Sequence, residues 1–299
     1  MNWNFLSLAN LITKTDSVVK IKDYDFCEPV FLLWILSLYK SDVIKIDCSD
    51  IEFQEVNNYL NRIDFFKHLG IKSSLINRNY SDNLVEITPI NLKTSWCDTD
   101  KITKKIISNI WIPYKVENKF LYWTLEWIFW ELIDNSIQHS KSNFDKGGSY
   151  FMLQSYPKKW ELHICIVDNW IWIRESFRLS SYWDNNKSDE HYINLAFQRW
   201  KTSNSDIGAW NWLYWTKEIV KKTNSKLKYL SWKTLYTIDW EEKYFNQNDI
   251  WWNWVLLDLQ INLDNLSKSD IIEWLKEIGH SSSFIDQELD DKEYDELFW

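Results

Sequence analysis

Apolar side chains recur at steps of three and four residues along positions 117–140, the strongest helical pattern in the chain. Leu121, Leu125, Ile128 and Leu132 fall on one face at this spacing, and the pair Ile133 and Ile137 continues it. Such a stripe is typical of an amphipathic helix that packs against a core. The spacing therefore predicts a helix over this segment with one buried face.

Strand-like patterns follow this helix. β-Branched and aromatic residues are enriched, between turn residues, in SYFMLQSY (149–156), ELHICIV (161–167), LKYL (227–230), TLYTI (234–238) and VLLDLQINL (255–263). Residues 212–222 have a helical pattern, whereas residues 178–207 are polar and irregular and predict a long loop. These helices and strands are therefore expected to form one α/β domain.

The regions before and after this domain have patterns of their own. Residues 1–95 predict a small α/β unit, with a strand at 43–47 and a helix at 55–70 that Gly70 would cap, and its only histidine, His68, lacks a second metal ligand nearby. Residues 96–116 form a connection. Residues 266–299 contain one short helix and an acidic end, interpreted as a solvated tail or, alternatively, a docking segment for a basic partner.

Charge and cysteine usage narrow the functional classes. The net charge is −9 and the pI about 5.2, and no basic cluster is present, so a general nucleic-acid surface is not expected. The four cysteines lack metal-site spacing and are interpreted as reduced thiols. The longest apolar run, at 31–39, is too short to span a bilayer, and the N-terminus lacks a basic leader segment. We expect a soluble, cytoplasmic protein.

Tryptophan and glycine occur in unusual numbers. The chain has 22 Trp and only 5 Gly in 299 residues, whereas glycine usually makes up about 7% of a soluble protein. Trp160, Trp232 and Trp240 lie between strand-like runs, at turn positions that favour glycine. Trp251, Trp252 and Trp254 precede the last strand in a similar context.

These positions suggest that many tryptophans stand where the organism inserts glycine. A UGA codon means stop, tryptophan or, in some bacterial lineages, glycine, so a reassigned UGA translated as Trp would produce this composition. The alternative is a chain that truly is rich in tryptophan, with an aromatic core or a Trp-lined binding surface. The contexts of Trp3, Trp34 and Trp183 do not distinguish the two.

Candidate chemistry begins on the long predicted helix. Glu131 and Asn135 are four residues apart, so both side chains lie on one helical face and can reach one ligand, although a solvated stripe would look the same. With Trp replaced by Gly, VDNWIWI (167–173) becomes a strand followed by D-x-G-x-G-I. DIGAWNWLYWTKEIV (206–220) likewise becomes a G-x-G-x-G-L loop that opens a helix.

In this order WELIDNSIQHS (130–140), VDNWIWI and DIGAWNWLYWTKEIV resemble the three motifs of the GHKL superfamily, the Bergerat-fold ATPases and kinases. The resemblance covers roughly residues 105–262; each motif is weak by itself, and the ordered set is specific. It implies a two-layer α/β sandwich. The pattern of residues 1–95 weakly resembles the STAS-like units that accompany some bacterial members, and the anti-sigma-factor kinases are the members most similar in organisation.

The resemblance assigns roles to the motif residues. Asn135 would help to hold Mg²⁺, Glu131 would orient or deprotonate an attacking water or hydroxyl, and Asp168 would accept a hydrogen bond from the adenine amino group. Glycine at 170 and 172 would let the backbone pass close to the base, where the chain has Trp170 and Trp172. The remaining contacts are expected near the phosphates, from Lys201, Thr202, Gly208, Trp210, Trp212 and Leu213.

Together these patterns predict a cytoplasmic ATP-binding regulatory protein that uses Mg²⁺ and ATP. It would hydrolyse ATP or transfer the phosphate to Ser or Thr of a partner regulatory protein, and a homodimer is compatible with the resemblance. One alternative is an ATP-gated switch without catalysis. Another, which holds if the tryptophans are literal, is a Trp-rich binding protein that takes no nucleotide, because indoles would crowd the motif positions. Neither a membrane nor nucleic acid is expected as a partner.

Overall fold

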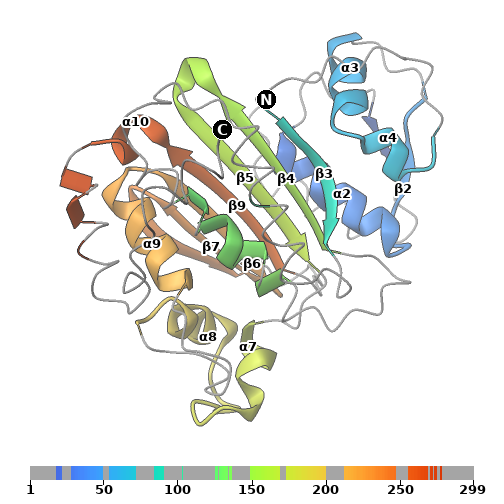
Figure 1. The fold of residues 1–299 in the computed structure, drawn as a ribbon. Helices are drawn as coiled ribbons and strands as arrows, with labels where there is room; N and C mark the ends of the chain where they lie inside the picture. The colour runs from blue at the N-terminus through green and yellow to red at the C-terminus, as the bar shows by residue number, and fades with distance from the viewer. Residues whose placement is uncertain are drawn as a thin grey trace.

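The computed structural model describes residues 18–21, 28–49, 54–71, 84–90, 103, 125–126, 128–133, 135–136, 149–168, 173–199, 212–246, 255–268, 270–271, 273–274 and 277. Within these ranges the protein is mixed α/β, built around one large sheet with helices on both of its faces (Figure 1).

The large sheet has seven antiparallel strands in the order β3-β4-β5-β9-β6-β7-β8. Their bounds are β3 Leu84–Ile90, β4 Ser149–Tyr156, β5 Glu161–Asp168, β6 Lys226–Ser231, β7 Thr234–Asp239, β8 Glu241–Asn246 and β9 Val255–Asn262. The five strands expected between positions 149 and 263 are confirmed. The sequence reading missed β8, because its charged EEKYFN pattern suits an exposed edge strand more than a buried one.

Helices cover one face of the sheet and bury the larger core. The helical residues 125–126, 128–133 and 135–136, here called the Glu131 helix, contribute buried Leu125, Ile128, Leu132 and Ile133, as the periodicity predicted. Other helices that join this core include α8 Asp189–Ala196, α9 Trp212–Lys222 and α10 Leu263–Leu266. The predicted second helix at 212–222 is confirmed by α9.

The opposite face of the sheet is covered as well. Helix α2 (Pro29–Lys40) is apolar on all sides and is buried from Pro29 to Leu38, with Pro29 in its first turn. It packs against inward-facing side chains of the strands, among them Met152, Val167 and Leu256. The sheet is therefore the middle of three layers. Two layers were expected for residues 105–262, and the third is supplied by α2, from the N-terminal unit that was expected to be separate. Burial of nearly every residue of β4 explains why one helical layer is insufficient.

The remaining N-terminal elements surround α2. Strands β1 (Val18–Lys20) and β2 (Lys45–Asp47) pair in parallel, with α2 as the connection between them. The helix expected at 55–70 is two helices, α3 (Gln54–Arg62) and α4 (Phe65–His68). They are separated because Asp64 has a left-handed conformation with φ 63°. Strand β3 also precedes the predicted domain boundary at residue 95, and it pairs with β4 as an edge of the large sheet.

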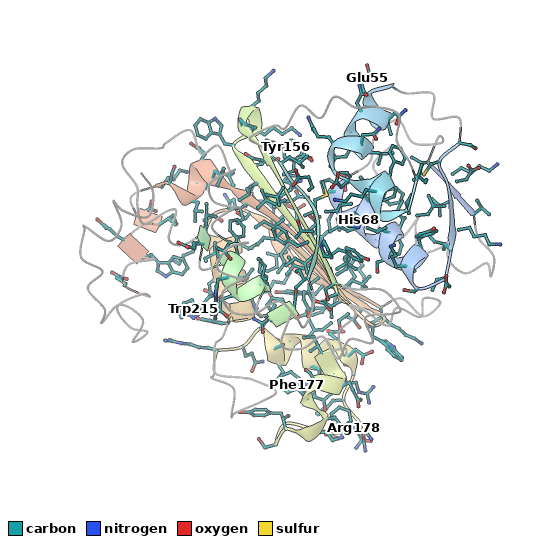
Figure 2. All side chains as sticks on the ribbon, turned by 45° about the vertical axis from the view of Figure 1, so that its right-hand side comes forward. Glu55, His68, Tyr156, Phe177, Arg178 and Trp215 are labelled. Atoms are coloured by element: carbon teal, nitrogen blue, oxygen red, sulfur yellow. The ribbon has the colours of Figure 1, made fainter. Side chains whose placement is uncertain are left out.

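His68 lies on α4 (Figure 2) and has a structural environment, as the sequence suggested. Its Nε2 atom lies 2.9 Å from the carbonyl oxygen of Ile87 on β3, and its ring meets that of Tyr150 edge-on. Burial lowers the pKa of His68, and the hydrogen bond to Ile87 opposes this effect. The neutral ring therefore ties α4 to the sheet.

Other expectations concern the ends of the chain and the cysteines. Cys48 and Cys165 are free thiols, while Cys27 and Cys97 lie outside the described residues. Described residues between 270 and 277 are helical, as expected, and the acidic end lies outside the described part. No helix among the described residues is long and apolar enough to cross a membrane.

Gly70 ends α4 in the way the sequence predicted. Its φ is 75°, its N–H donates to the carbonyl of Lys67 at 3.1 Å, and the N–H of Ile71 donates to Phe66 at 2.9 Å. This pair of bonds is a Schellman motif, in which glycine is favoured because it has no Cβ.

Replacing Gly70 with Ala should destabilise the protein by about 1 kcal/mol, because an L-residue is strained at this φ. A Cβ at this position would meet no atom within 4 Å, so the cost is conformational rather than steric. In chemical denaturation the free energy of unfolding should be highest for the parent protein, lower for Gly70→Asn and lowest for Gly70→Ala, since Asn tolerates the left-handed region. Equal stability of the Ala variant and the parent would contradict this account.

Candidate functional site

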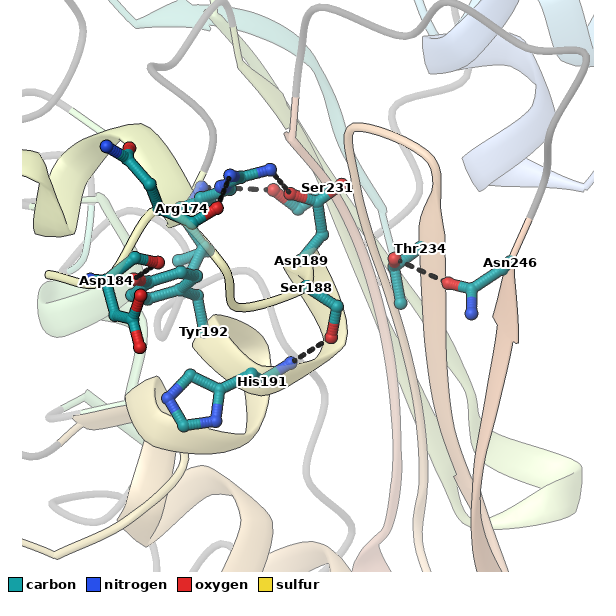
Figure 3. A network of polar contacts seen from close by, with 11 residues as sticks. Arg174, Asp184, Ser188, Asp189, His191, Tyr192, Ser231, Thr234 and Asn246 are labelled. Carbon is teal, nitrogen blue, oxygen red and sulfur yellow. Dashed lines mark hydrogen bonds and ion pairs between the residues drawn. The ribbon is translucent and has the colours of Figure 1, made fainter.

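A buried polar row crosses one end of the sheet on the face that carries the Glu131 helix. Strand pairing aligns Asp168 with Val255, Val255 with Ser231, and Ser231 with Thr234. The polar members are 1%, 2% and 1% exposed, respectively. Thr234 donates its hydroxyl to Oδ1 of Asn246 at 2.9 Å, which extends the row to β8 (Figure 3). The row lies at the C-terminal ends of β5 and β6.

Asp168 and Tyr229 are two buried titratable residues at this end of the sheet. Tyr229 is one step further into the sheet, where it pairs with Leu257. Burial, and secondarily the charge of Asp168, raise the pKa of Tyr229, so its phenol stays protonated. The hydroxyl makes no hydrogen bond within the part of the chain that the structure describes. A buried carboxylate near a buried, unsatisfied hydroxyl is suited to a polar ligand group.

Glu131 and Asn135 lie on the helix above the same face. Glu131 is 3% exposed and Asn135 is half-buried. Nδ2 of Asn135 donates to the backbone carbonyl of Glu131 at 2.7 Å, which fixes the amide and leaves its oxygen as the available acceptor. An amide oxygen held in this way is a suitable ligand for a hard cation.

Helix α9 is anchored to the sheet by a charged cluster. Glu242 on β8 accepts hydrogen bonds from Lys217 at 2.9 Å and from the Tyr236 hydroxyl at 2.8 Å, and it also pairs with Lys221. Burial opposes ionisation of Glu242, but the hydrogen bonds from Lys221, Lys217 and Tyr236 outweigh it and lower its pKa to about 2. Both lysines belong to α9, so Glu242 links this helix to strand β8.

Residues 173–199 form a folded module. The sequence predicted an irregular loop at 178–207, which is wrong for residues 178–199, while residues 200–207 lie outside the described part. The module contains α7 (Ile173–Ser176), the 3₁₀ turn η4 (Phe177–Leu179) and α8. Ser188 caps α8 by accepting a hydrogen bond from the N–H of His191 at 3.2 Å (Figure 3). The N–H of Ile173, in turn, donates to Oγ of Ser231 at 3.1 Å, which attaches the start of the module to the polar row.

Aromatic rings pack together within the module. The segment was predicted to be a loop because most of its other residues are polar. The ring of Trp183 stacks on Tyr192 at 5.3 Å, and the guanidinium of Arg174 lies over Trp183 at 5.5 Å. Arg174 also pairs with Asp189 at 3.7 Å. The Tyr192 hydroxyl donates to the carbonyl of Asp184 at 2.8 Å and accepts from its N–H at 2.7 Å. These contacts order a segment adjacent to the site.

The structure describes only some of the residues that were predicted for the site. Glu131, Asn135 and Asp168 occupy one face of the sheet and its helical cover, and α9 begins at Trp212, followed by Leu213, which is 6% exposed. The other predicted positions lie outside the described residues, namely Trp170, Trp172, Lys201, Thr202, Gly208 and Trp210.

Sequence reasoning missed Tyr229, Ser231, Thr234 and Glu242. These residues join the site through strand pairing and not through a local motif, so only the register of β6, β7 and β8 could have revealed them. Among the described residues no group of three or more His, Cys, Asp or Glu side chains could hold a metal. No protein-family model matches the chain, and no curated protein or solved structure matches it either.

Ser231→Ala should destabilise the protein by about 1–3 kcal/mol, because the N–H of Ile173 would lose its acceptor in a buried place. Chemical denaturation measures the loss. Ser267→Ala is the matched control, since that exposed hydroxyl only donates to the carbonyl of Asp264 and its removal should change little. A loss no greater than that of the control would show that the Ser231 bond is dispensable.

The acid limb of the stability curve should depend on Glu242. Its folded pKa of about 2 lies below the ordinary glutamate value of 4.5, so its contribution to stability is complete above about pH 4.5 and is lost as the pH falls toward 2. In Glu242→Gln this part of the pH dependence should disappear. Glu241→Gln, on the exposed neighbour, is the control; an unchanged acid limb in the Glu242 variant would refute the role of the cluster.

Proposed function

We propose that the chain is an ATP-binding regulatory protein of the GHKL type, with a Bergerat-like arrangement of its nucleotide site. It would bind Mg-ATP against the helix-bearing face of the sheet and hydrolyse it, or transfer the phosphate to Ser or Thr of a partner protein. The observation that carries this proposal is the placement of Asp168, the Glu131 helix and the start of α9 on one face of one antiparallel sheet.

The base-binding end would be formed by Asp168. Its side chain has the same parity along β5 as Leu162, Ile164 and Ile166, which belong to the core beneath the helices. A carboxylate that is only 1% exposed at a strand end would accept hydrogen bonds from an exocyclic amino group. The neighbouring hydroxyl of Tyr229 could serve the same ligand, directly or through a water.

The phosphate-binding end would be formed by the first turn of α9 and by the Glu131 helix. The N-terminus of an 11-residue helix presents unpaired N–H groups and the positive end of the helix dipole, both of which favour phosphate. Asn135 offers an amide oxygen to the metal. Bound Mg²⁺ would neutralise charge on the phosphate oxygens, which is most of what phosphoryl transfer requires besides positioning.

Glu131 would act as the base. Its carboxylate would take the proton from a water, or from the hydroxyl of a partner Ser or Thr, as that oxygen attacks the γ-phosphorus. The bond between the γ-phosphorus and the bridging oxygen would break as the new bond forms, and ADP would leave with the electron pair. Hydrolysis and transfer to a partner differ only in which hydroxyl Glu131 faces.

A second candidate is an ATP-gated switch without turnover. The module of residues 173–199 favours it, because this compact unit is attached to the polar row through Ser231 and could respond to the ligand there. Helix α2 packs on the back of the same strands, which provides a contact route to the N-terminal elements. In this case nucleotide would change the affinity for a partner, with no ADP formed.

We expect Glu131→Ala to lower ATP turnover by about 10²–10⁴-fold while ATP affinity stays nearly unchanged, because the residue handles a proton and does not bind the base. Asp168→Asn should instead weaken binding by about tenfold or more, through loss of a buried charged acceptor. Both would be measured on the full chain with glycine at positions 170, 172, 210 and 212, by calorimetry with Mg-ATP and by single-turnover ADP formation.

The outcomes separate the candidates. Binding without ADP after hours favours the switch, and equal loss of binding and turnover in Glu131→Ala rejects its role as base. No Mg-ATP binding by the folded glycine chain would reject the nucleotide proposal. Binding by the glycine chain but not by the chain as printed would indicate that indoles block the site.

A further inference from the structure

The tryptophans of the described part include two groups that differ in backbone and packing. Trp160, Trp232 and Trp240 have φ values of 54°, 54° and 68°, in the left-handed region that disfavours side chains. Trp34 lies within α2 and is 2% exposed, and Trp183 stacks on Tyr192 in the module of residues 173–199. The backbone penalises an indole in the first group, and packing uses it in the second.

Hairpin geometry sets φ in the first group. Tyr156 pairs with Glu161, so the loop of β4 and β5 is Pro157 to Trp160, and Trp160 ends its 3₁₀ turn in the left-handed conformation. Ser231 pairs with Thr234, which leaves a two-residue turn with positive φ at its first position, Trp232. Such turns take glycine at that position.

Trp240 is the extreme case. It is the single residue between the paired Asp239 and Glu241, and it is 85% exposed. An indole at this tip is stabilised little by burial, and its backbone bears the conformational strain of a positive φ. Glycine would have neither the exposed ring nor the strain.

The other described residues with positive φ follow the ordinary rule. They are Asp42, Asp64, Asn224 and Gly70. Asp, Asn and Gly are the residue types that enter the left-handed region readily, and tryptophan is not one of them. Tryptophan therefore takes the place that glycine usually has, in a chain with 22 Trp and 5 Gly.

We propose that the cell that makes this protein inserts glycine at positions 160, 232 and 240 and tryptophan at positions 34 and 183. Two codons have then been written as one residue: UGA, read as glycine by the cell, and UGG, read as tryptophan. The backbone of three hairpins and the packing of two rings carry this assignment, and it does not depend on nucleotide binding.

The assignment has a consequence for the motifs that resemble GHKL proteins. Trp170, Trp172, Trp210 and Trp212 occupy positions where those motifs have glycine. If the same codon is used there, the indoles that would crowd a nucleotide disappear. The hairpins thus test the codon reading at places where no ligand is involved.

The gene and the natural protein provide the direct test. We expect TGA codons at 160, 232 and 240 and TGG codons at 34 and 183, and peptide masses of the protein from its own cells should match glycine at the first three positions. TGG codons at the three hairpin positions would overturn the proposal. TGA at 34 or 183 would overturn the division into two groups.

Stability of the full chain gives an independent test. Changing Trp160, Trp232 and Trp240 to Gly should raise the folding equilibrium constant by about tenfold per position, because left-handed strain is relieved. The control changes the same positions to Ala, which removes the indoles but keeps Cβ. A glycine triple variant no more stable than the alanine triple variant would contradict the assignment.

Trp34→Gly and Trp183→Gly should have the opposite effect. Each removes a packed ring, and Trp34→Gly also places glycine within a buried helix, so the denaturation midpoint should fall. A rise in the midpoint of either variant would show that the packed rings are not native.

Discussion

The structure depends on one constraint, that the central strands of the large sheet are apolar on both faces. Strand β4 is buried at all but its last residue, and β5 and β9 are buried at most positions. Such strands are stable only between two layers of other elements. The Glu131 helix, α8, α9 and α10 supply one layer and α2 supplies the other. The candidate site lies at one end of the interface between the sheet and the layer that contains the Glu131 helix, so its location follows from this packing.

Much of this architecture could be predicted from the sequence, and the exceptions have physical explanations. Periodicity located the Glu131 helix and α9, and strand patterns located β4, β5, β6, β7 and β9. Periodicity did not reveal that β3 joins the large sheet, because the pairing of strands that are distant in the sequence does not show in any local pattern. The charged pattern of β8 suits a solvated edge, and the module of residues 173–199 has a few aromatic rings within a polar segment.

The candidate site shows the same division between local and long-range information. Glu131, Asn135 and Asp168 could be identified because each lies in a short motif with a defined spacing. Tyr229, Ser231 and Thr234 could not, since strand pairing alone brings them to the same end of the sheet as Asp168. The left-handed backbone at Trp160, Trp232 and Trp240 likewise became visible only in the structure, because it follows from the geometry of the hairpins.

The third layer also affects how the chain can be divided. A fragment that began after β3 would retain the three motifs but would leave the α2-facing side of β4, β5 and β9 in contact with water, including Met152, Val167 and Leu256. Exposed apolar sheet surface promotes association between molecules. The N-terminal elements are therefore part of the same folded unit as the strands that carry the motifs, because α2 covers one face of those strands.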